Sequence, residues 1–191
     1  GRIVAGSIKL NGQDLLKLSE AEMRKVRGNR ISMIFQEPMT SLNPVISVGK
    51  QIAEAVILHQ NVSKQEAADK AVEMLALVRI PEATRRAKEY PHQLSGGMRQ
   101  RLGIAQAIAG DPRLIIVDEP TAGLDPEERL RFYRLLAELA ESRIVLLSTH
   151  IVDDVAVLCP RFAVLHQGTI LASTTPSAAR DALAGAMFEG E

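Results

Sequence analysis

The chain alternates short apolar runs with longer stretches in which apolar residues recur at helical spacing. Three runs, at 30–35, 114–117 and 144–147, are too short for helices and predict strands, of which the last two are expected to be buried. The longer stretches, which begin near residues 96 and 126, predict helices between the strands. This alternation is typical of an α/β fold with a parallel sheet.

The first half of the chain predicts several smaller elements. A short strand near 8–10 precedes a turn at Asn11-Gly12, and Ser19–Glu22 then form a capping box that predicts a short helix. Between 48 and 89, apolar residues at helical spacing predict a helical insert, and a second capping box at Ser63–Glu66 lies inside it.

The last part of the chain predicts a hairpin and a tail. Apolar residues at 162–165 and 169–171 flank a turn at Gln167-Gly168, which is the pattern of a closing hairpin. A weak helix near 177–184 is expected next, and the composition from Thr174 onward predicts a fraying tail.

The composition is that of a globular domain with balanced charge. The 191 residues suffice for one medium domain, and 23 basic residues match 23 acidic ones, so no global field favours nucleic acid. The single cysteine, Cys159, excludes an internal disulfide, and we expect it to be a buried apolar residue. No apolar run approaches the roughly 18 residues of a membrane span, and the start has no signal pattern. We therefore expect a cytoplasmic protein that reaches a membrane only through partners.

Two acids directly follow the predicted strand at 114–117. Asp118 and Glu119 are expected at the carboxyl edge of the sheet, where ligands bind in open α/β folds. There Asp118 could hold Mg²⁺ through water and Glu119 could polarise an attacking water, as metal-assisted phosphoryl transfer requires. The alternative is that both acids only end the strand before Pro120.

Ser95-Gly96-Gly97 opens the predicted helix near residue 96. Glycines at a helix start let backbone N–H groups approach an anion closely, and the helix dipole adds partial positive charge. The pattern predicts a phosphate ligand in Ser95, and the alternative is an ordinary serine N-cap. Asp125, followed by Pro126, is a strong N-cap for the next helix.

A histidine, His150, follows the predicted strand at 144–147. The carboxyl ends of parallel strands share one edge, so His150 is expected at the same edge as Glu119. An imidazole there can hydrogen-bond a γ-phosphate and the attacking water, and the alternative is a structural histidine. The remaining histidines are expected to be structural: His59, His92 and His166.

Three motifs together resemble those of the ATP-binding cassette family, the ATPase subunits of ABC transporters. Leu94–Met98 is similar to the family signature, with Met98 in place of the usual glutamine. The apolar strand that ends in Asp118-Glu119 resembles Walker B, and Gly123-Leu124-Asp125 resembles the D-loop. The resemblance implies a P-loop NTPase-like cassette core, in which a parallel sheet has an antiparallel edge, together with a helical subdomain.

The resemblance also implies roles in ATP hydrolysis. Glu119 is the expected base, Asp118 is expected at Mg²⁺, and His150 is the expected switch histidine at the γ-phosphate. Gln36 resembles the Q-loop glutamine, which can reach Mg²⁺ and the attacking water, whereas a lone glutamine would more simply cap a strand end. A groove for a partner helix is expected beside this loop.

The same resemblance implies partners. In the family two cassettes sandwich two ATP molecules, so Ser95, Gly96 and Gly97 would serve the ATP of a second cassette, with Asp125 in the D-loop at the same nucleotide. The second cassette would be an identical or a different chain. Transmembrane permease subunits are the other expected partners, and they would hold the protein on the cytoplasmic face of the membrane.

The chain departs from the family pattern in one motif. The P-loop, Gly-x-x-x-x-Gly-Lys-Ser/Thr, holds the β and γ phosphates, and it does not occur in these residues. We therefore expect a cassette without its amino-terminal P-loop strand and helix. Such a chain should bind ATP poorly and pack imperfectly where that strand would lie.

The two halves resemble different kinds of cassette. The segments 35–44 and 90–101 are similar to oligopeptide and dipeptide importers, whereas 118–129 and the residues up to His150 are more similar to exporter-type cassettes. A chimaera joined near the signature is one explanation.

The chain is expected to have four parts. A partial ATPase core with the Q-loop spans 1–47, and a helical subdomain spans 48–93. The rest of the ATPase core spans 94–175, and a tail spans 176–191.

The expected function is that of a nucleotide-binding subunit of an ABC transporter, which couples ATP binding and hydrolysis to transport, with peptide-type cargo favoured. The alternative is a non-catalytic, truncated or chimeric cassette fragment, which the missing P-loop favours. A third hypothesis, a cassette ATPase of repair or translation, is disfavoured because the chain has no basic stripe.

Overall fold

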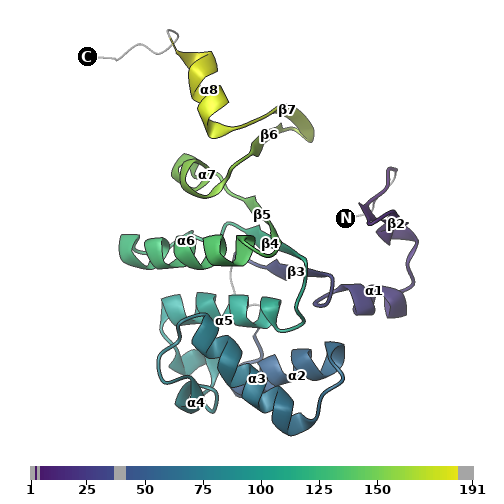
Figure 1. The fold of residues 1–191 in the computed structure, drawn as a ribbon, viewed down its shortest axis with the longest axis vertical. Helices are drawn as coiled ribbons and strands as arrows, with labels where there is room; N and C mark the ends of the chain where they lie inside the picture. The colour runs from purple at the N-terminus through teal and green to yellow at the C-terminus, as the bar shows by residue number, and fades with distance from the viewer. Residues whose placement is uncertain (1–2, 4, 37–41, 185–191) are drawn as a thin grey trace.

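Three parallel strands form the centre of the molecule. The structure is a computed structural model that describes residues 3, 5–36 and 42–184. In it, β3 (Ile31–Ile34), β4 (Leu114–Asp118) and β5 (Ile144–Ser148) form one sheet in the order β3-β4-β5 (Figure 1). Both strand pairs are parallel. The three predicted strands are confirmed, and their carboxyl ends lie at one edge of the sheet.

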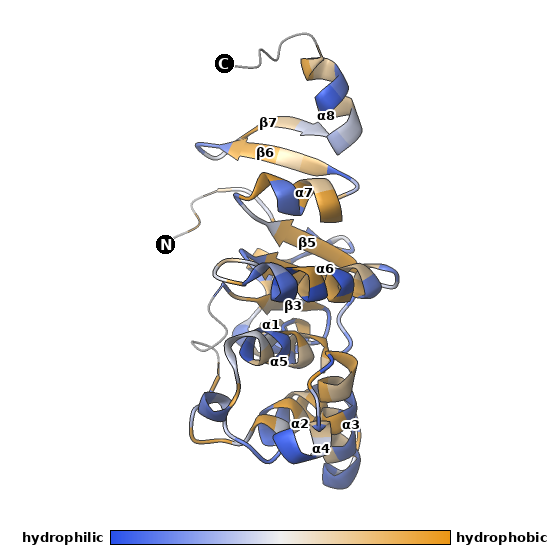
Figure 2. Cartoon of the chain, turned by 90° about the vertical axis from the view of Figure 1, so that its left-hand side faces the viewer, coloured by the Kyte–Doolittle hydropathy of each residue, from blue (hydrophilic) through white to orange (hydrophobic). Residues whose placement is uncertain are grey.

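Two helices pack against this sheet. Helix α5 (Gly96–Ile108) contacts β3, and α6 (Pro126–Ala140) contacts β5. Figure 2 shows the strands as mainly apolar and the helices as mixed, since each helix has one side in solvent. The core between them contains fully buried side chains: Leu102, Ile104, Ile115 and Val117. Each such side chain contributes about 1.5 to 3 kcal/mol relative to its exposed state.

The helical insert lies on the far side of α5 from the sheet (Figure 1). It consists of α2 (Val48–His59), α3 (Lys64–Leu77) and the short α4 (Ala83–Arg86). The predicted capping box is present: the Ser63 side chain accepts from the N–H of Glu66, and the Glu66 side chain accepts from the N–H of Ser63. Within the described residues, no helix is both long and apolar enough to cross a membrane.

Smaller elements flank the sheet and the insert. The predicted early strand and turn form a ribbon of β1 (Lys9–Leu10) and β2 (Gln13–Asp14), and the closing hairpin is formed by β6 (Phe162–His166) and β7 (Thr169–Thr174). Neither pair is hydrogen-bonded to the parallel sheet in the described residues. The remaining elements are short helices: 3-10 helices at Leu15–Lys17 and Pro91–Gln93, and α1 (Glu20–Val26), α7 (Val152–Leu158) and α8 (Pro176–Leu183).

Two details of the prediction are wrong. Strand β5 is not buried on both faces: Val145 and Leu147 pack against the core, but Ile144 and Leu146 are 68% and 57% exposed. An apolar run predicts burial on both faces only for a central strand such as β4, whereas β5 is last in the observed strand order. Cys159 is half-buried rather than buried, because it ends the short helix α7, and its partial burial raises the pKa of the thiol.

The contact between α6 and α7 predicts a loss of stability at alkaline pH. The pKa of the Tyr133 hydroxyl is raised to about 12, mainly by burial and secondly by its hydrogen bond to Asp154. In the unfolded chain the hydroxyl titrates near pH 10. Between about pH 10 and pH 12 only the unfolded state loses this proton. The stability that the protonated Tyr133 hydroxyl contributes is therefore complete below pH 10 and is lost as pH rises toward 12. We expect the free energy of unfolding to fall by about 2 to 3 kcal/mol over this range.

Urea unfolding at a series of pH values from 9 to about 12 measures this loss. Tyr133→Phe should remove this part of the pH dependence, whereas the exposed Tyr90, replaced by Phe, should leave it in place. An equally steep fall in Tyr133→Phe and in the wild type would contradict the assignment.

Candidate functional site

The carboxyl edge of the sheet brings together two of the predicted site residues. Glu119 follows the last residue of β4, and His150 lies two positions beyond the end of β5. Nδ1 of His150 is 2.7 Å from Oε2 of Glu119, so the two side chains lie at the same edge and contact each other. The Glu119 side chain is 21% exposed and that of His150 is 75% exposed, so the imidazole forms the solvent side of the pair.

The backbone of Glu119 is held in an uncommon conformation. Its φ is 45°, in the left-handed region that non-glycine residues rarely adopt. The N–H of Glu119 donates to the carbonyl of Ser148 at 2.9 Å, so the strained residue is fixed to the end of β5. Such strain is found where the surrounding structure imposes it, often at functional sites.

The Glu119 carboxylate has spare acceptor capacity. Oε2 is buried, and its polar neighbour within the described residues is Nδ1 of His150 at 2.7 Å. A carboxylate oxygen has two lone pairs, so Oε2 can accept from a further donor such as a water molecule. The pair therefore suits a site in which Glu119 accepts a proton from water.

Asp118 lies beside this pair, at the end of β4. It is opposite Ser148 in the strand register, and the Ser148 hydroxyl donates to Oδ1 of Asp118. No group of three or more His, Cys, Asp or Glu side chains gathers as a metal site in the described residues. An Mg²⁺ ion at Asp118 would need further oxygen ligands, such as phosphate oxygens and water, which is how proteins usually bind this ion.

Gln36 lies at the same edge but not in the same cluster. It is exposed, two positions beyond the end of β3, and Ile34 is opposite Val117 in the parallel register. No hydrogen bond or ion pair joins Gln36 to Asp118, Glu119 or His150 in the described part of the chain. Residues 37–41, which complete the segment that resembles the Q-loop, lie outside the described residues.

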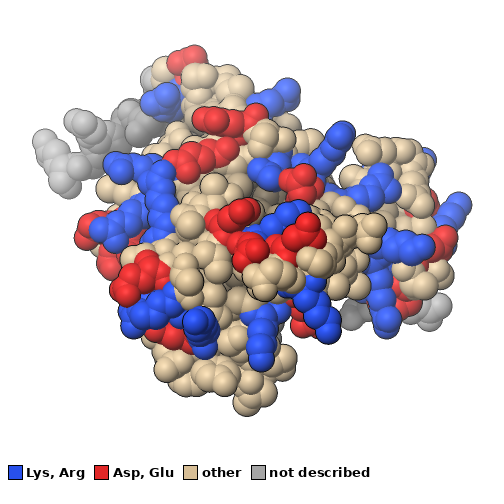
Figure 3. Space-filling model, turned by 60° about the horizontal axis from the view of Figure 1, so that its bottom comes forward, with Lys and Arg blue, Asp and Glu red and all other residues tan. Residues whose placement is uncertain are grey.

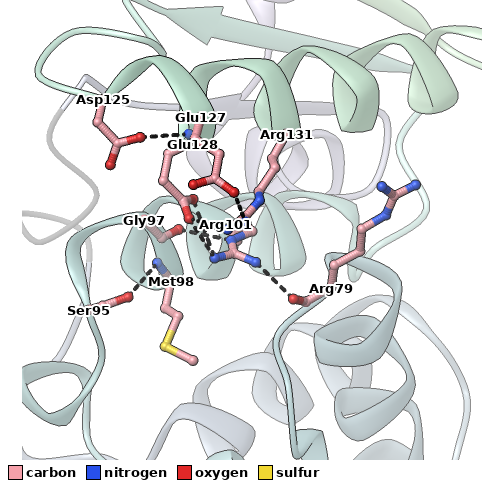
Figure 4. A network of polar contacts seen from close by, with 9 residues as sticks. All are labelled: Arg79, Ser95, Gly97, Met98, Arg101, Asp125, Glu127, Glu128 and Arg131. Carbon is pink, nitrogen blue, oxygen red and sulfur yellow. Dashed lines mark hydrogen bonds and ion pairs between the residues drawn. The ribbon is translucent and has the colours of Figure 1, made fainter.

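The start of α5 is exposed, as a ligand site requires. The Ser95 hydroxyl caps the helix by accepting from the N–H of Met98 at 3.3 Å, so the N-cap alternative is confirmed as one role of this serine (Figure 4). A Cβ on Gly96 would meet no atom within 4 Å, which leaves open space at the helix end. Whether Ser95 also binds phosphate stays a prediction.

A network of charged side chains joins α5 to α6, as Figure 4 shows. Arg101 donates to the carbonyls of Gly97 and Arg79 and pairs with Glu128 at 3.3 Å. Both members of this ion pair are largely buried, at 13% and 20% exposed. The Glu128 carboxylate covers Gly97, where any side chain would collide with it. The network fixes the signature segment to the first turn of α6.

Asp125 belongs to the same region. Its side chain accepts from the N–H of Glu128 at 2.8 Å, and Pro126 occupies the first helical position, so the predicted N-cap is confirmed (Figure 4). Ser95, Gly97 and Asp125 thus lie around one network. No hydrogen bond or ion pair joins them to Glu119 or His150 within the described residues.

Sequence patterns did not indicate Arg101 and Glu128 as a pair. Arg101 lies in α5 and Glu128 in the first turn of α6, and only the tertiary fold brings them together. The surface charge in this view does not indicate a binding site, since Figure 3 shows acidic and basic side chains interspersed over the face it presents.

Comparison with known proteins agrees with these features. Over 183 residues the chain is 50% identical to a probable peptide ABC transporter ATP-binding protein of Sinorhizobium fredii, covering 94% of this chain and 55% of the relative. It is 46% identical over 170 residues to the oligopeptide transport ATP-binding protein OppD of Escherichia coli, covering 88% of this chain and 50% of that protein. The chain thus spans about half the length of these relatives.

A solved structure shares the fold. The ATP-binding cassette MJ0796, in a dimeric post-hydrolysis state bound to ADP and Pi, matches 90% of this chain and 74% of its own chain, with a TM-score of 0.79 and 27% identity. The family model described as ABC transporter matches residues 2–122. With the α/β cassette fold and the motifs at the sheet edge, this match shows that the chain belongs to the ABC transporter family.

Proposed function

We propose that this chain forms the ATP-binding and ATP-hydrolysing part of an ABC importer whose cargo is peptides. The contact between Glu119 and His150 at the carboxyl edge of the sheet is the observation that supports it most directly. The cargo is proposed because the relatives described above are named for peptide and oligopeptide transport.

The residues at this edge fit a nucleotide and its metal ion. Glu119 has a buried acceptor oxygen beside the imidazole of His150, and the Asp118 carboxylate and the Gln36 amide offer oxygen ligands of the kind that Mg²⁺ prefers. When bound, MgATP supplies the phosphoryl group and a cation that neutralises its charge. The chain would then contribute Glu119 as proton acceptor for water and His150 as hydrogen-bond donor beside it.

The signature segment would serve the nucleotide of a second cassette. Ser95 and Gly96 are exposed at the N-terminus of α5, with Gly97 partly covered beside them, and a helix N-terminus is a favourable place for an anion. They lie around a different network from Glu119 and His150, so one chain would hold only part of each nucleotide site. MJ0796, which shares the fold, has been solved as a dimer. Dimerisation would thus complete the site, with Asp125 near the shared nucleotide.

The helical insert offers a surface for the permease. A groove of about 880 Å³ lies between α2, α3 and α4. Its apolar lining includes the exposed Ile57 and Leu58, and charged residues border it: Lys50, Glu54, Lys64, Asp69 and Lys88. An amphipathic helix would bury apolar side chains here and pair its charges at the rim. Docking of a permease helix would hold the protein peripherally on the cytoplasmic face of the membrane.

Uptake of a labelled tripeptide by the source cells tests the proposal. Deletion of the gene should abolish the uptake, and the wild-type gene should restore it, whereas Glu119→Gln should not. Uptake of a free amino acid is the control, and it should be the same in all strains. Equal tripeptide uptake with and without the gene would contradict peptide transport, and rescue by Glu119→Gln would contradict the hydrolytic role.

A further inference from the structure

One acid near the site is not among the residues proposed to bind or hydrolyse ATP. Asp154, in α7, is fully buried, and it forms no ion pair in the described residues. Buried carboxylates are normally paired with a cation, because the loss of hydration is expensive. Asp154 instead accepts hydrogen bonds from three hydroxyl groups: those of Thr121, Tyr133 and Thr149.

The three donors come from different parts of the fold. Thr121 lies two residues after Glu119, and Thr149 immediately precedes His150. Both threonines donate to the same oxygen, Oδ2 of Asp154, at 2.7 Å and 2.9 Å. Tyr133 belongs to α6 and donates to the other oxygen, Oδ1. One carboxylate oxygen therefore bridges the loop after Glu119 and the loop that contains His150, while the second oxygen is anchored to a helix.

The bridge is tied directly to the backbone around His150. The Thr149 hydroxyl donates to Asp154 and also accepts from the N–H of Ile151 at 3.0 Å. Thr121 is fully buried, so its hydroxyl cannot hydrogen-bond to bulk water instead of to Asp154. A second connection, from the N–H of Glu119 to the carbonyl of Ser148, joins the same two loops on the backbone side.

We propose that Asp154 is a positioning residue for hydrolysis, which holds His150 against Glu119 by bridging Thr121 and Thr149. The proposal rests on the proposed function, because the Glu119–His150 pair matters only if the site hydrolyses ATP. Without the bridge the loop of His150 keeps one connection to the loop of Glu119 instead of two. The 2.7 Å contact between the imidazole and the carboxylate is then no longer fixed.

Isosteric variants separate positioning from simple stabilisation. Thr121→Val and Thr149→Val each remove one hydroxyl from the bridge, and each should lower kcat for ATP about 10-fold while KM changes less than about 2-fold. The double variant should be no worse than about 20-fold, since both changes break the same bridge. Tyr133→Phe is the matched control: it removes a hydroxyl from the same carboxylate but touches neither site loop, and kcat should stay within about 2-fold.

A conservative change at the acid itself should preserve the bridge. In Asp154→Asn the amide oxygen can accept from both threonines, and the amide nitrogen can donate to the Tyr133 hydroxyl. We expect its kcat to stay within about 3-fold of the wild type. A 10-fold loss of kcat in Tyr133→Phe, or unchanged kcat in both threonine variants, would overturn the proposal.

Hydrogen exchange of the purified protein provides a readout that does not depend on activity. Peptides that contain Ile151 should exchange about 10-fold faster in Thr121→Val than in Tyr133→Phe, relative to peptides from α5 that report global unfolding. Equal exchange would overturn the bridge. If the wild-type protein hydrolysed no ATP while this difference persisted, the proposed function would fail and the bridge would remain as a structural finding only.

Discussion

Replacing His150 by alanine is expected to lower the kcat for ATP hydrolysis about 100-fold, because the imidazole is the direct neighbour of the Glu119 carboxylate at the sheet edge. The variant should fold normally, since the His150 side chain is 75% exposed and its removal takes no contact from the core. Steady-state hydrolysis by the purified protein measures the effect. A side chain positioned for proton transfer commonly raises the rate about 10²-fold or more.

The control for this variant is another exposed histidine. His166 lies at the end of β6 in the closing hairpin, far along the chain from the site strands, and His166→Ala should leave kcat within about 2-fold. A His150→Ala protein that keeps more than about half of the wild-type kcat would show that the Glu119 contact has no part in hydrolysis.

Replacing Gly110 by alanine is expected to cost about 3 kcal/mol of stability. Gly110 follows the end of α5, where a methyl group would overlap the carbonyl oxygen of Gly28 and lie 2.8 Å from its carbonyl carbon. Gly28 cannot easily move, because its N–H donates to the carbonyl of Ile31 at 2.7 Å and its φ of 79° is that of a tight turn. The backbone leading into β3 would have to shift, and overpacking of this kind costs about 1 to 3 kcal/mol or more.

Urea unfolding of Gly110→Ala against Gly96→Ala tests this prediction. A methyl group on Gly96 would meet no atom within 4 Å, so the second change should alter stability by no more than about 0.5 kcal/mol. If Gly110→Ala unfolded at the wild-type midpoint, the close approach of the two glycine backbones would not exist in solution.

Sequence signals that span a single helical turn predict where several helices begin. The capping boxes at Ser19 and Ser63 are predicted from residues three positions apart, and the N-cap at Asp125 from the proline that follows it, and all three are present. The N-cap at Ser95, the alternative to a phosphate ligand, is present as well. These motifs are local, so tertiary packing has little opportunity to override them.

The candidate site could be predicted in part, because one topological rule places it. Once β4 and β5 are parallel neighbours, the residues after them share an edge, and Glu119 and His150 meet there. The rule does not extend to side-chain detail. Gln36 lies at the same edge, but within the described residues no hydrogen bond joins it to the pair, because Gln36 lies in a loop beyond the end of β3 and the strand register does not fix the direction of its side chain.

Other features depend on how elements far apart in sequence pack together. The apolar run at 144–147 gives no sign that Ile144 and Leu146 are exposed, because that depends on the place of β5 in the strand order. Asp154 looks like an ordinary polar residue at the start of α7, and its burial becomes visible only when α7 packs against α6. Neither property leaves a local pattern.

The most direct test of a hydrolytic site centred on Glu119 is the behaviour of Glu119→Gln in MgATP, measured on the protein purified with its membrane subunits. The glutamine preserves the shape of the side chain but cannot accept a proton from water. We predict that hydrolysis falls to about 1% of the wild-type rate or less while bound ATP accumulates and holds two cassettes together as a dimer. Hydrolysis by Glu119→Gln at the wild-type rate would contradict this account.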